Sequence, residues 1–448
     1  MKRILTIAGS DSGGGAGIQA DIKTISLLGG FAMSVVTALT AQNTEGVHAI
    51  HELPASFVED QFDAVVGDIG VDAAKTGMLS SAAIVRAVSR RIDRYSIEKL
   101  VVDPVMVAKS GDRLLSEDAE ETLRDELLPL AHVVTPNIPE AEVLTGIEVE
   151  DEASMEEAAI SIHRMGPEYV VVKGGHLKGK PIDILYDGES TTTLVTDRLA
   201  GKNTHGTGCT YSSALATFIG KGMEVSEAVA EAKEFVTDAI QHGLDLGRGH
   251  GPTNPYVRVA REMERYEVLR EVSSAARRLG EMEVGHLVPE VRSNLGYALH
   301  YARDTGDVAA IEGRITDVSG RMVACSCADF GVSSHVARII LTVMCHDPKF
   351  RAAMNIRYSP DIVSACEGAG LEVASFDRSS EPQRVKGKEG SSLGWGVTQV
   401  IERLGRVPDI IYDLGEIGKE PMVRVLGRNP GDIVRKVGVI SREIDTGA

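Results

Sequence analysis

Long hydrophobic stretches and aromatic residues are scarce in this chain of 448 residues. Aromatic residues make up 4% of it, and no apolar run reaches the roughly 18 residues that a membrane-spanning helix needs. The short apolar start at residues 1–10 leads directly into glycines, which predicts a buried first strand rather than a signal peptide. We therefore expect no membrane span and a cytoplasmic location.

Cysteine and positive charge are also limited. The five cysteines include no C-x-x-C pair, which argues against a disulfide scaffold and a zinc site. Cys325 and Cys327 are instead predicted to alternate along a buried strand. The 47 Lys and Arg residues against 65 Asp and Glu residues leave a net charge of −18, which opposes nucleic-acid binding. Cations must therefore be concentrated locally wherever an anionic substrate binds.

Two common phosphate-binding signatures are missing. The G-x-x-x-x-G-K-[ST] motif of P-loop enzymes does not occur in the sequence. The glycine run at residues 13–17 reaches only the looser G-x-G-x-x-A form of a dinucleotide fingerprint, at residues 15–20. These observations exclude a P-loop enzyme and weaken the case for a dehydrogenase.

The segment at residues 202–210 is the most informative stretch that is present. Two glycines flank Thr207, and a run of small residues with helical character follows. The backbone N–H groups of Gly206, Thr207, Gly208 and Cys209 can converge at the positive end of that helix, where a phosphoryl group is stabilised during transfer. The segment therefore predicts a phosphoryl-transfer site. Taken alone, it would better suit a plain turn between a strand and a helix.

Short apolar or β-branched runs alternate with helical spacing through the first half. Strands are expected at residues 4–8, 32–39, 100–102, 133–135, 169–173, 182–186 and 192–196. Helices are expected at residues 16–28, 117–128, 139–144, 155–165 and 208–218. This order predicts an α/β fold with a mainly parallel sheet covered by helices on both faces, and ligands that bind beyond the carboxyl ends of the strands.

A second, smaller α/β domain is expected after the Gly- and Pro-rich segment at residues 249–255. A charged amphipathic helix follows from about residue 257 to 279, and we place the domains at 1–258 and 259–448. Within the second domain we expect helices at 289–303 and 334–344 and strands at 311–316 and 322–327. Residues 379–392 are predicted to form a mobile loop.

Seven motifs of the first half occur in one order. They are residues 8–22, 37–44, 75–78, 102–107, 135–140, 171–176 and 203–209. This series resembles the ribokinase superfamily, and within it the hydroxymethylpyrimidine/phosphomethylpyrimidine kinases of thiamine biosynthesis. The resemblance covers about the first 255 residues. It implies a ribokinase-like fold, ATP and Mg²⁺ as cofactors, and two successive phosphorylations of a hydroxymethylpyrimidine.

The resemblance assigns roles to residues around the nucleotide. Asp103, Asn137 and Glu140 would hold Mg²⁺, which accepts few protein oxygens and many waters. The ATP phosphates would be bound by Lys173, Asn137, Thr207 and Lys233, with Lys173 also catalytic. Without the other motifs, the N-x-x-E pattern at residues 137–140 would suit an ordinary helix N-terminus.

The acceptor of the family is a flat aminopyrimidine. By resemblance, Gln42 would hydrogen-bond its amino group and a ring nitrogen, Asp21 would hold its hydroxymethyl group or polar edge, and Met78 and Val105 would pack on the ring. Cys209 stands where most ribokinase-like enzymes carry an Asp base. A thiol at a helix N-terminus ionises more easily, so Cys209 is either the base or a small structural residue.

The second half resembles the archaeal-type thiamine phosphate synthase domain. The resemblance rests on residues 288–298, 312–315, 329–338, 346–347, 353–358 and 407–413. It implies condensation of the pyrimidine diphosphate with hydroxyethylthiazole phosphate. Arg314 and His335 match the family's functional positions, and Arg292, Arg338 and Arg357 would bind phosphate.

Two alternatives stay open. The first half also suits a pyridoxal kinase, because both acceptors are flat heteroaromatic alcohols. The second half also suits a module that senses thiamine phosphate without catalysis. We expect a homo-oligomer with no nucleic-acid or membrane partner; the sequence does not decide its subunit number or whether the diphosphate passes directly between domains.

Overall fold

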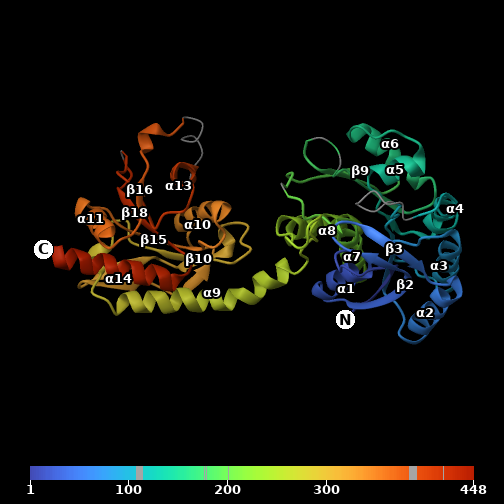
Figure 1. Cartoon of the computed structure of the whole chain (residues 1–448), viewed down its shortest axis with the longest axis horizontal. Coiled ribbons are helices and arrows are strands. Elements are labelled where there is room, and N and C mark those ends of the chain that lie inside the picture. The colour runs from blue at the N-terminus through green and yellow to red at the C-terminus, as the bar shows by residue number, and fades with distance from the viewer. Residues whose placement is uncertain are drawn as a thin grey trace. The chain divides into compact units, whose positions relative to one another are not determined.

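The computed structural model describes residues 1–106, 115–175, 177, 179–199, 201–382, 391–416 and 418–447. The chain forms two compact units, Met1–Val259 and Ala260–Ala448. Figure 1 shows a sheet with surrounding helices in each unit. Among the described residues, no helix combines the length and the apolar character needed to cross a membrane. The predicted mobile loop at 379–392 lies largely outside the described residues.

The first unit is built on a nine-stranded sheet in the order β3-β2-β1-β4-β5-β6-β7-β8-β9. Its strands are β1 (Arg3–Asp11), β2 (Phe31–Gln42), β3 (Val47–Glu52), β4 (Ala73–Thr76), β5 (Leu100–Val102), β6 (Val133–Val134), β7 (Tyr169–Lys173), β8 (Ile182–Tyr186) and β9 (Thr191–Val195). The six strands from β2 to β7 in this order are parallel, while the pairings of β3 with β2, of β8 with β7 and of β9 with β8 are antiparallel. The predicted mainly parallel sheet is therefore confirmed.

Helices cover both faces of this sheet. They are α1 (Gly17–Leu27), α2 (Ala55–Asp68), α3 (Ala82–Arg94), α4 (Glu117–Thr122), α5 (Ile138–Thr145), α6 (Glu152–His163), α7 (Thr207–Gly220) and α8 (Val225–Gln241). Val102 packs in one core with α2 and α3, while its neighbour Val101 packs in another with α7 and α8. Because both faces are buried, the strands read as continuous apolar runs.

The second unit has a seven-stranded sheet in the order β14-β11-β10-β15-β18-β17-β16 and a separate pair, β12 and β13. Its strands are β10 (Leu295–Ala298), β11 (Val308–Ile311), β12 (Ile315–Val318), β13 (Arg321–Ala324), β14 (Ala328–Phe330), β15 (Ala352–Arg357), β16 (Val373–Ser375), β17 (Ile410–Asp413) and β18 (Met422–Gly427). Its helices are α9 (Val257–Gly280), α10 (Ser334–His346), α11 (Pro360–Gly368), α13 (Ser391–Leu404) and α14 (Pro430–Gly447). All pairings in the large sheet are antiparallel except that of β16 with β17.

Two sequence predictions for the second unit were wrong. The helix expected at 289–303 is a turn followed by β10, a strand buried on both faces, so its apolar residues carry no alternation that would distinguish a strand from a helix. The buried alternation expected for Cys325 and Cys327 is also absent, because both side chains are exposed. Within the described ranges, no three or more His, Cys, Asp or Glu side chains are grouped so that they could hold a metal ion.

Candidate active sites

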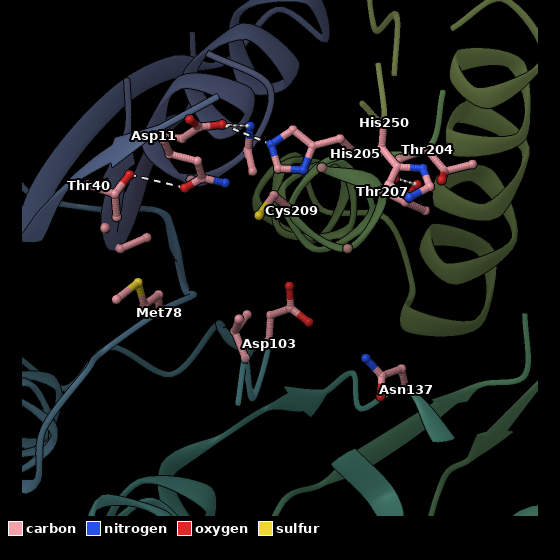
Figure 2. Close-up of a pocket in the computed structure, with 18 of the residues that line it drawn as sticks. Asp11, Thr40, Met78, Asp103, Asn137, Thr204, His205, Thr207, Cys209 and His250 are labelled. Atoms are coloured by element: carbon pink, nitrogen blue, oxygen red, sulfur yellow. Dashed lines mark hydrogen bonds and ion pairs between the residues drawn. The ribbon is translucent and has the colours of Figure 1, made fainter. Parts of the chain in front are cut away.

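A cavity of about 620 Å³ opens in the first unit where the parallel strands end. Residues at or beyond the carboxyl ends of β1, β2, β4, β5, β6 and β7 line it, together with the segment that leads into α7. Figure 2 shows Cys209 at the start of α7, with Asp103, Met78 and Asn137 across the open space. The position is the one expected of a ligand site in a parallel sheet.

The turn before α7 supplies the amide groups of this site. Gly206 has a left-handed backbone, with φ of 79°, and Thr207 begins the helix. The Thr207 hydroxyl donates to the carbonyl of Thr204 at 2.7 Å, which fixes the turn. The Thr207 N–H donates to the same Thr204 carbonyl at 3.4 Å. The N–H groups that follow it in the first turn of a helix have no intrahelical acceptor, so this end of α7 presents donors and a positive dipole to the cavity.

A buried ion pair faces these amides. The Lys173 ammonium lies 2.9 Å from Asp103 Oδ1, and Ser212 donates to Asp103 Oδ2 at 3.2 Å. Burial alone would raise the pKa of Asp103, but Lys173 and Lys75 hold it below its ordinary value. Asp103 is therefore a carboxylate, and Lys173 brings a positive charge to the cavity wall.

Asn137 and Glu140 form a capping box at the start of α5. Asn137 Oδ1 accepts from the Glu140 N–H at 3.0 Å, and Glu140 Oε2 accepts from the Asn137 N–H at 2.8 Å. The ordinary helix N-terminus considered from the sequence is thus present, yet both residues also line the cavity. Burial raises the pKa of Glu140 to about 7.

Three of the four residues expected to bind the acceptor line the cavity: Gln42, Met78 and Val105. The Thr40 hydroxyl donates to Gln42 Oε1 at 3.1 Å, which orients the side-chain amide. Asp21 is the exception, because it is fully buried and accepts from Lys75, Thr6 and Ser213. With these partners, Asp21 lies beneath the site rather than at the expected contact with substrate.

Cys209 and Lys233 also differ from expectation. Cys209 lines the cavity, but burial raises the pKa of its thiol to about 12 despite the opposing effect of Lys75. The easier ionisation expected from the helix N-terminus is outweighed by desolvation. Lys233 is not among the cavity residues, since its ammonium lies 2.8 Å from Asp183 in the interior.

A second cluster of polar residues lies in the second unit. His335, at the start of α10, is exposed. Partial desolvation lowers the pKa of its imidazole, and the positive charges of Arg314, Arg338, Arg424 and Arg378 lower it further. Several cations are therefore concentrated around one imidazole in a chain of net charge −18. This is the local accumulation that an anionic substrate requires.

Arg378 and Arg424 were missed by the sequence reasoning. Arg378 Nε lies 2.6 Å from Asp413 Oδ1, and Arg424 Nη2 lies 2.6 Å from Asp413 Oδ2, with all three residues buried. The sequence does give one indication of this pair, because Arg424 stands among the apolar residues of strand β18. Arg292 and Arg357, which were predicted to bind phosphate, are exposed.

The fold and the first site define a small-molecule kinase, with an amide-lined turn and a lysine facing an acceptor pocket. The sequence profile of phosphomethylpyrimidine kinase matches residues 11–254, and the chain belongs to that family. A profile described as thiamine-phosphate synthase ThiN matches residues 271–438. The matches confirm both resemblances drawn from the sequence: the first half belongs to the kinase family, and the second half is similar to the thiamine-phosphate synthase profile.

The chain is similar to several named proteins. It is 55% identical over 252 residues to the thiamine biosynthesis bifunctional protein ThiED of Geobacter sulfurreducens, a match that covers 56% of this chain and 51% of that protein. The chain thus spans about half the length of that relative. The hydroxymethylpyrimidine/phosphomethylpyrimidine kinase of Streptomyces coelicolor is 51% identical over 251 residues, covering 56% of this chain and 93% of the relative.

Two solved structures share the fold of the first unit. The pyridoxal kinase of Bacillus subtilis in an ADP complex matches with a TM-score of 0.54 and 39% identity, covering 58% of this chain and 99% of that one. The pyridoxal kinase of Staphylococcus aureus with AMP-PCP and pyridoxal matches with a TM-score of 0.53 and 36% identity, covering 57% and 93%. These nucleotide complexes are consistent with the ATP use expected of the family.

Proposed function

We propose that the first unit transfers a phosphoryl group from ATP twice, first to the hydroxymethyl group of 4-amino-5-hydroxymethyl-2-methylpyrimidine and then to the resulting monophosphate. The observation that carries this proposal is the shared cavity, which Gln42 and Met78 line together with Lys173 and the turn before α7. Holding acceptor and donor in one orientation supplies much of the catalysis of phosphoryl transfer.

The residues divide the work of this reaction. The Gln42 amide hydrogen-bonds the aminopyrimidine edge, while Met78 and Val105 pack on the ring. Amides of Gly206, Thr207 and Gly208 receive the negative charge of the transferring group. Lys173 neutralises a phosphate oxygen as a point charge.

The carboxylates of the cavity fit a Mg²⁺ ion. Asp103 is ionised, and the raised pKa of Glu140 means that a neighbouring cation would stabilise its charged form. Asp103 and Glu140 would hold the ion with waters, and Asn137 would keep Glu140 in place through the capping box. When bound, Mg²⁺ would neutralise phosphate charge.

The second unit would join the pyrimidine diphosphate to hydroxyethylthiazole phosphate. A bond forms between the thiazole nitrogen and the pyrimidine methylene carbon, the carbon–oxygen bond to the diphosphate breaks, and pyrophosphate leaves. Arg314 and Arg338 would bind the phosphate groups through charge-assisted hydrogen bonds. His335, neutral because of its lowered pKa, would be the polar catalytic residue beside them.

A coupled assay tests both proposals. The full chain is incubated with ATP, Mg²⁺, the hydroxymethylpyrimidine and the thiazole phosphate, and thiamine phosphate is measured as its fluorescent oxidised product. Pyridoxal in place of the pyrimidine is the competing acceptor. We expect thiamine phosphate, and a lower kcat/KM for pyridoxal; a preference for pyridoxal would contradict the assignment of the first unit.

The sensor alternative predicts a different result. The chain would make the pyrimidine diphosphate but release no pyrophosphate on addition of the thiazole phosphate, and added thiamine phosphate would inhibit the kinase. That combination would sink the synthase proposal and leave the kinase. The cytoplasmic location, the homo-oligomer and the domain limits 1–258 and 259–448 stay predictions.

A further inference from the structure

The glycine run at residues 13–17 is filled by a side chain of the protein itself. Asp11 Oδ1 accepts from the N–H of Gly13 at 2.8 Å, and Oδ2 accepts from Gly15 at 3.0 Å and Ala16 at 2.8 Å. Successive amides of this kind commonly bind the phosphate of a ligand. Here a buried carboxylate takes that place, so the run is not available to a nucleotide.

The same carboxylate reaches the turn before α7. His205 Nε2 lies 3.0 Å from Asp11 Oδ2, and Figure 2 shows the ring between Asp11 and the residues of that turn. Burial alone would raise the pKa of Asp11, but His205 and the amides hold it below its ordinary value. Asp11 is therefore a charged acceptor shared by two segments nearly 200 residues apart.

The two segments also touch closely through their backbones. A Cβ atom on Gly206 would lie 1.8 Å from the carbonyl oxygen of Gly15, and a Cβ atom on Gly15 would lie 2.4 Å from the His205 ring. Each glycine is required by the approach of the other segment. The glycine run and the phosphoryl-binding turn are thus in fixed contact.

The glycine run is attached to the acceptor wall as well. The Ser12 hydroxyl donates to the carbonyl of Gln42 at 2.9 Å, and the Gln42 N–H donates back to Ser12 Oγ at 2.9 Å. A continuous set of contacts therefore leads from Gln42 through Ser12, Asp11 and His205 to Gly206. It connects the residue that recognises the acceptor with the amides that receive the phosphoryl group.

We propose that His205 is a positioning residue of the kinase, which holds the phosphoryl-binding turn at a fixed distance from Gln42 through its hydrogen bond to Asp11. This inference rests on the proposed kinase function. A displacement of about 1 Å between reacting groups can lower a rate roughly a hundredfold. We expect the contact to act more on turnover than on nucleotide affinity, because Lys173 and the residues proposed to hold Mg²⁺, which also bind the nucleotide, lie on other elements, β7, α5 and the end of β5.

The test compares His205→Ala with His205→Gln in the full chain. The Gln side chain keeps an N–H donor for Asp11, so we expect His205→Gln to retain activity within a factor of about three, whereas His205→Ala loses roughly 10- to 100-fold in kcat. KM for ATP should stay within about twofold in both variants. Asp11→Asn, which removes the charge from the shared acceptor, should resemble His205→Ala.

Matched controls separate this inference from the kinase proposal. His48→Ala removes an exposed histidine of β3 and should leave kcat unchanged. A wild-type chain that phosphorylates no hydroxymethylpyrimidine refutes the proposed function itself. If the wild type is active, the inference is overturned when His205→Ala keeps its kcat or when His205→Gln is as slow as His205→Ala. Should His205→Ala fail to fold, the comparison of His205→Gln with Asp11→Asn decides: equal loss in both contradicts the inference.

Discussion

The Cys209 thiol occupies the position where related enzymes have a catalytic base, but it is not ionised as a base would need to be. Its pKa, raised to about 12 by burial, keeps it protonated at neutral pH. Only the thiolate form of cysteine could accept a proton. Removal of the hydroxymethyl proton therefore does not rely on an already ionised Cys209. We therefore favour the structural role for Cys209, that of a small residue that admits the acceptor to the amides.

Cys209→Ala should accordingly slow the two phosphorylations by a similar factor. Only the first step deprotonates an alcohol, so a base would be needed there alone. Single-turnover assays with the alcohol and with the monophosphate measure the two factors. A loss confined to the first step would restore the role of base.

Alkylation provides an independent measure of the same thiol. With iodoacetamide at pH 8, exposed Cys345 should react well before Cys209, because the raised pKa of Cys209 leaves little of its reactive thiolate at that pH. Peptide mass spectrometry reports both sites from one sample, with Cys345 as the internal reference.

The pKa of His335 is expected to lie below its ordinary value of about 6.5, because partial desolvation and the nearby arginines oppose its protonation. A lowered folded pKa means that this site contributes stability above about pH 6.5 and loses it as pH falls through the folded pKa. NMR titration of the imidazole should show the midpoint rising in Arg314→Gln and unchanged in Arg321→Gln. A wild-type midpoint at or above 6.5 would contradict the arrangement.

Individual residues were predicted from the sequence to different extents. Gln42 and Met78 were placed at the cavity, because their motifs follow strands of a parallel sheet. Asp21 and Lys233 were not, because a carboxylate or an ammonium that is satisfied by a buried partner has the same sequence appearance as one that faces a ligand. The pairing of Asp413 with two arginines joins residues that are 35 and 11 positions apart in the sequence, which no local pattern reports.

Among the elements, the turn before α7 depends most on one residue. Gly206→Ala would place a Cβ atom against Gly15 as well as impose a left-handed backbone, whereas Gly222→Ala imposes the left-handed backbone with nothing within 4 Å. Each backbone change costs roughly 1–2 kcal/mol of stability.

Only Gly206→Ala should also lose kinase activity, by tenfold or more on the order expected for misplaced amides. Thermal unfolding and initial rates of both variants provide the comparison. Similar activity in the two would show that the turn tolerates displacement.

In the first unit, the elements were predicted well where the length of an apolar run distinguishes a short strand from a longer helix. Runs of three to five apolar residues, such as those of β5 and β7, have the length of strands buried on both faces. The same property misled the prediction for β10, because its apolar residues sit in a longer apolar stretch without polar alternation. The edge strand β3, largely exposed, carried no burial signal to detect.

For the whole molecule, helix α9 determines where the chain can be divided. Arg258 lies 3.3 Å from Asp238 and from Glu231 on α8, while Val268, Val272 and Leu279 belong to the core of the second unit. If the chain is divided after residue 258, Arg258 keeps its ion pairs with α8, and Val268, Val272 and Leu279 keep their packing in the core of the second unit.

Fragments 1–258 and 259–448 should therefore fold separately. The first should convert the hydroxymethylpyrimidine to its diphosphate, and the second should make thiamine phosphate from supplied diphosphate and thiazole phosphate without ATP. Arg314→Ala in the second should lower its rate by a loss of about 1.5–3 kcal/mol, as expected for a charge-assisted contact. A folded second fragment that binds thiamine phosphate but makes none would identify it as a sensor.

The carboxylate that fills the glycine run has a consequence for selectivity. If both glycine-rich loops beside the pocket had free amides, the phosphates of ATP could bind at either loop. Phosphates bound at the glycine run would then block the binding of the acceptor. The Asp11 carboxylate already occupies the amides of the glycine run. Asp11 therefore keeps phosphates away from these amides and favours their binding at the turn before α7.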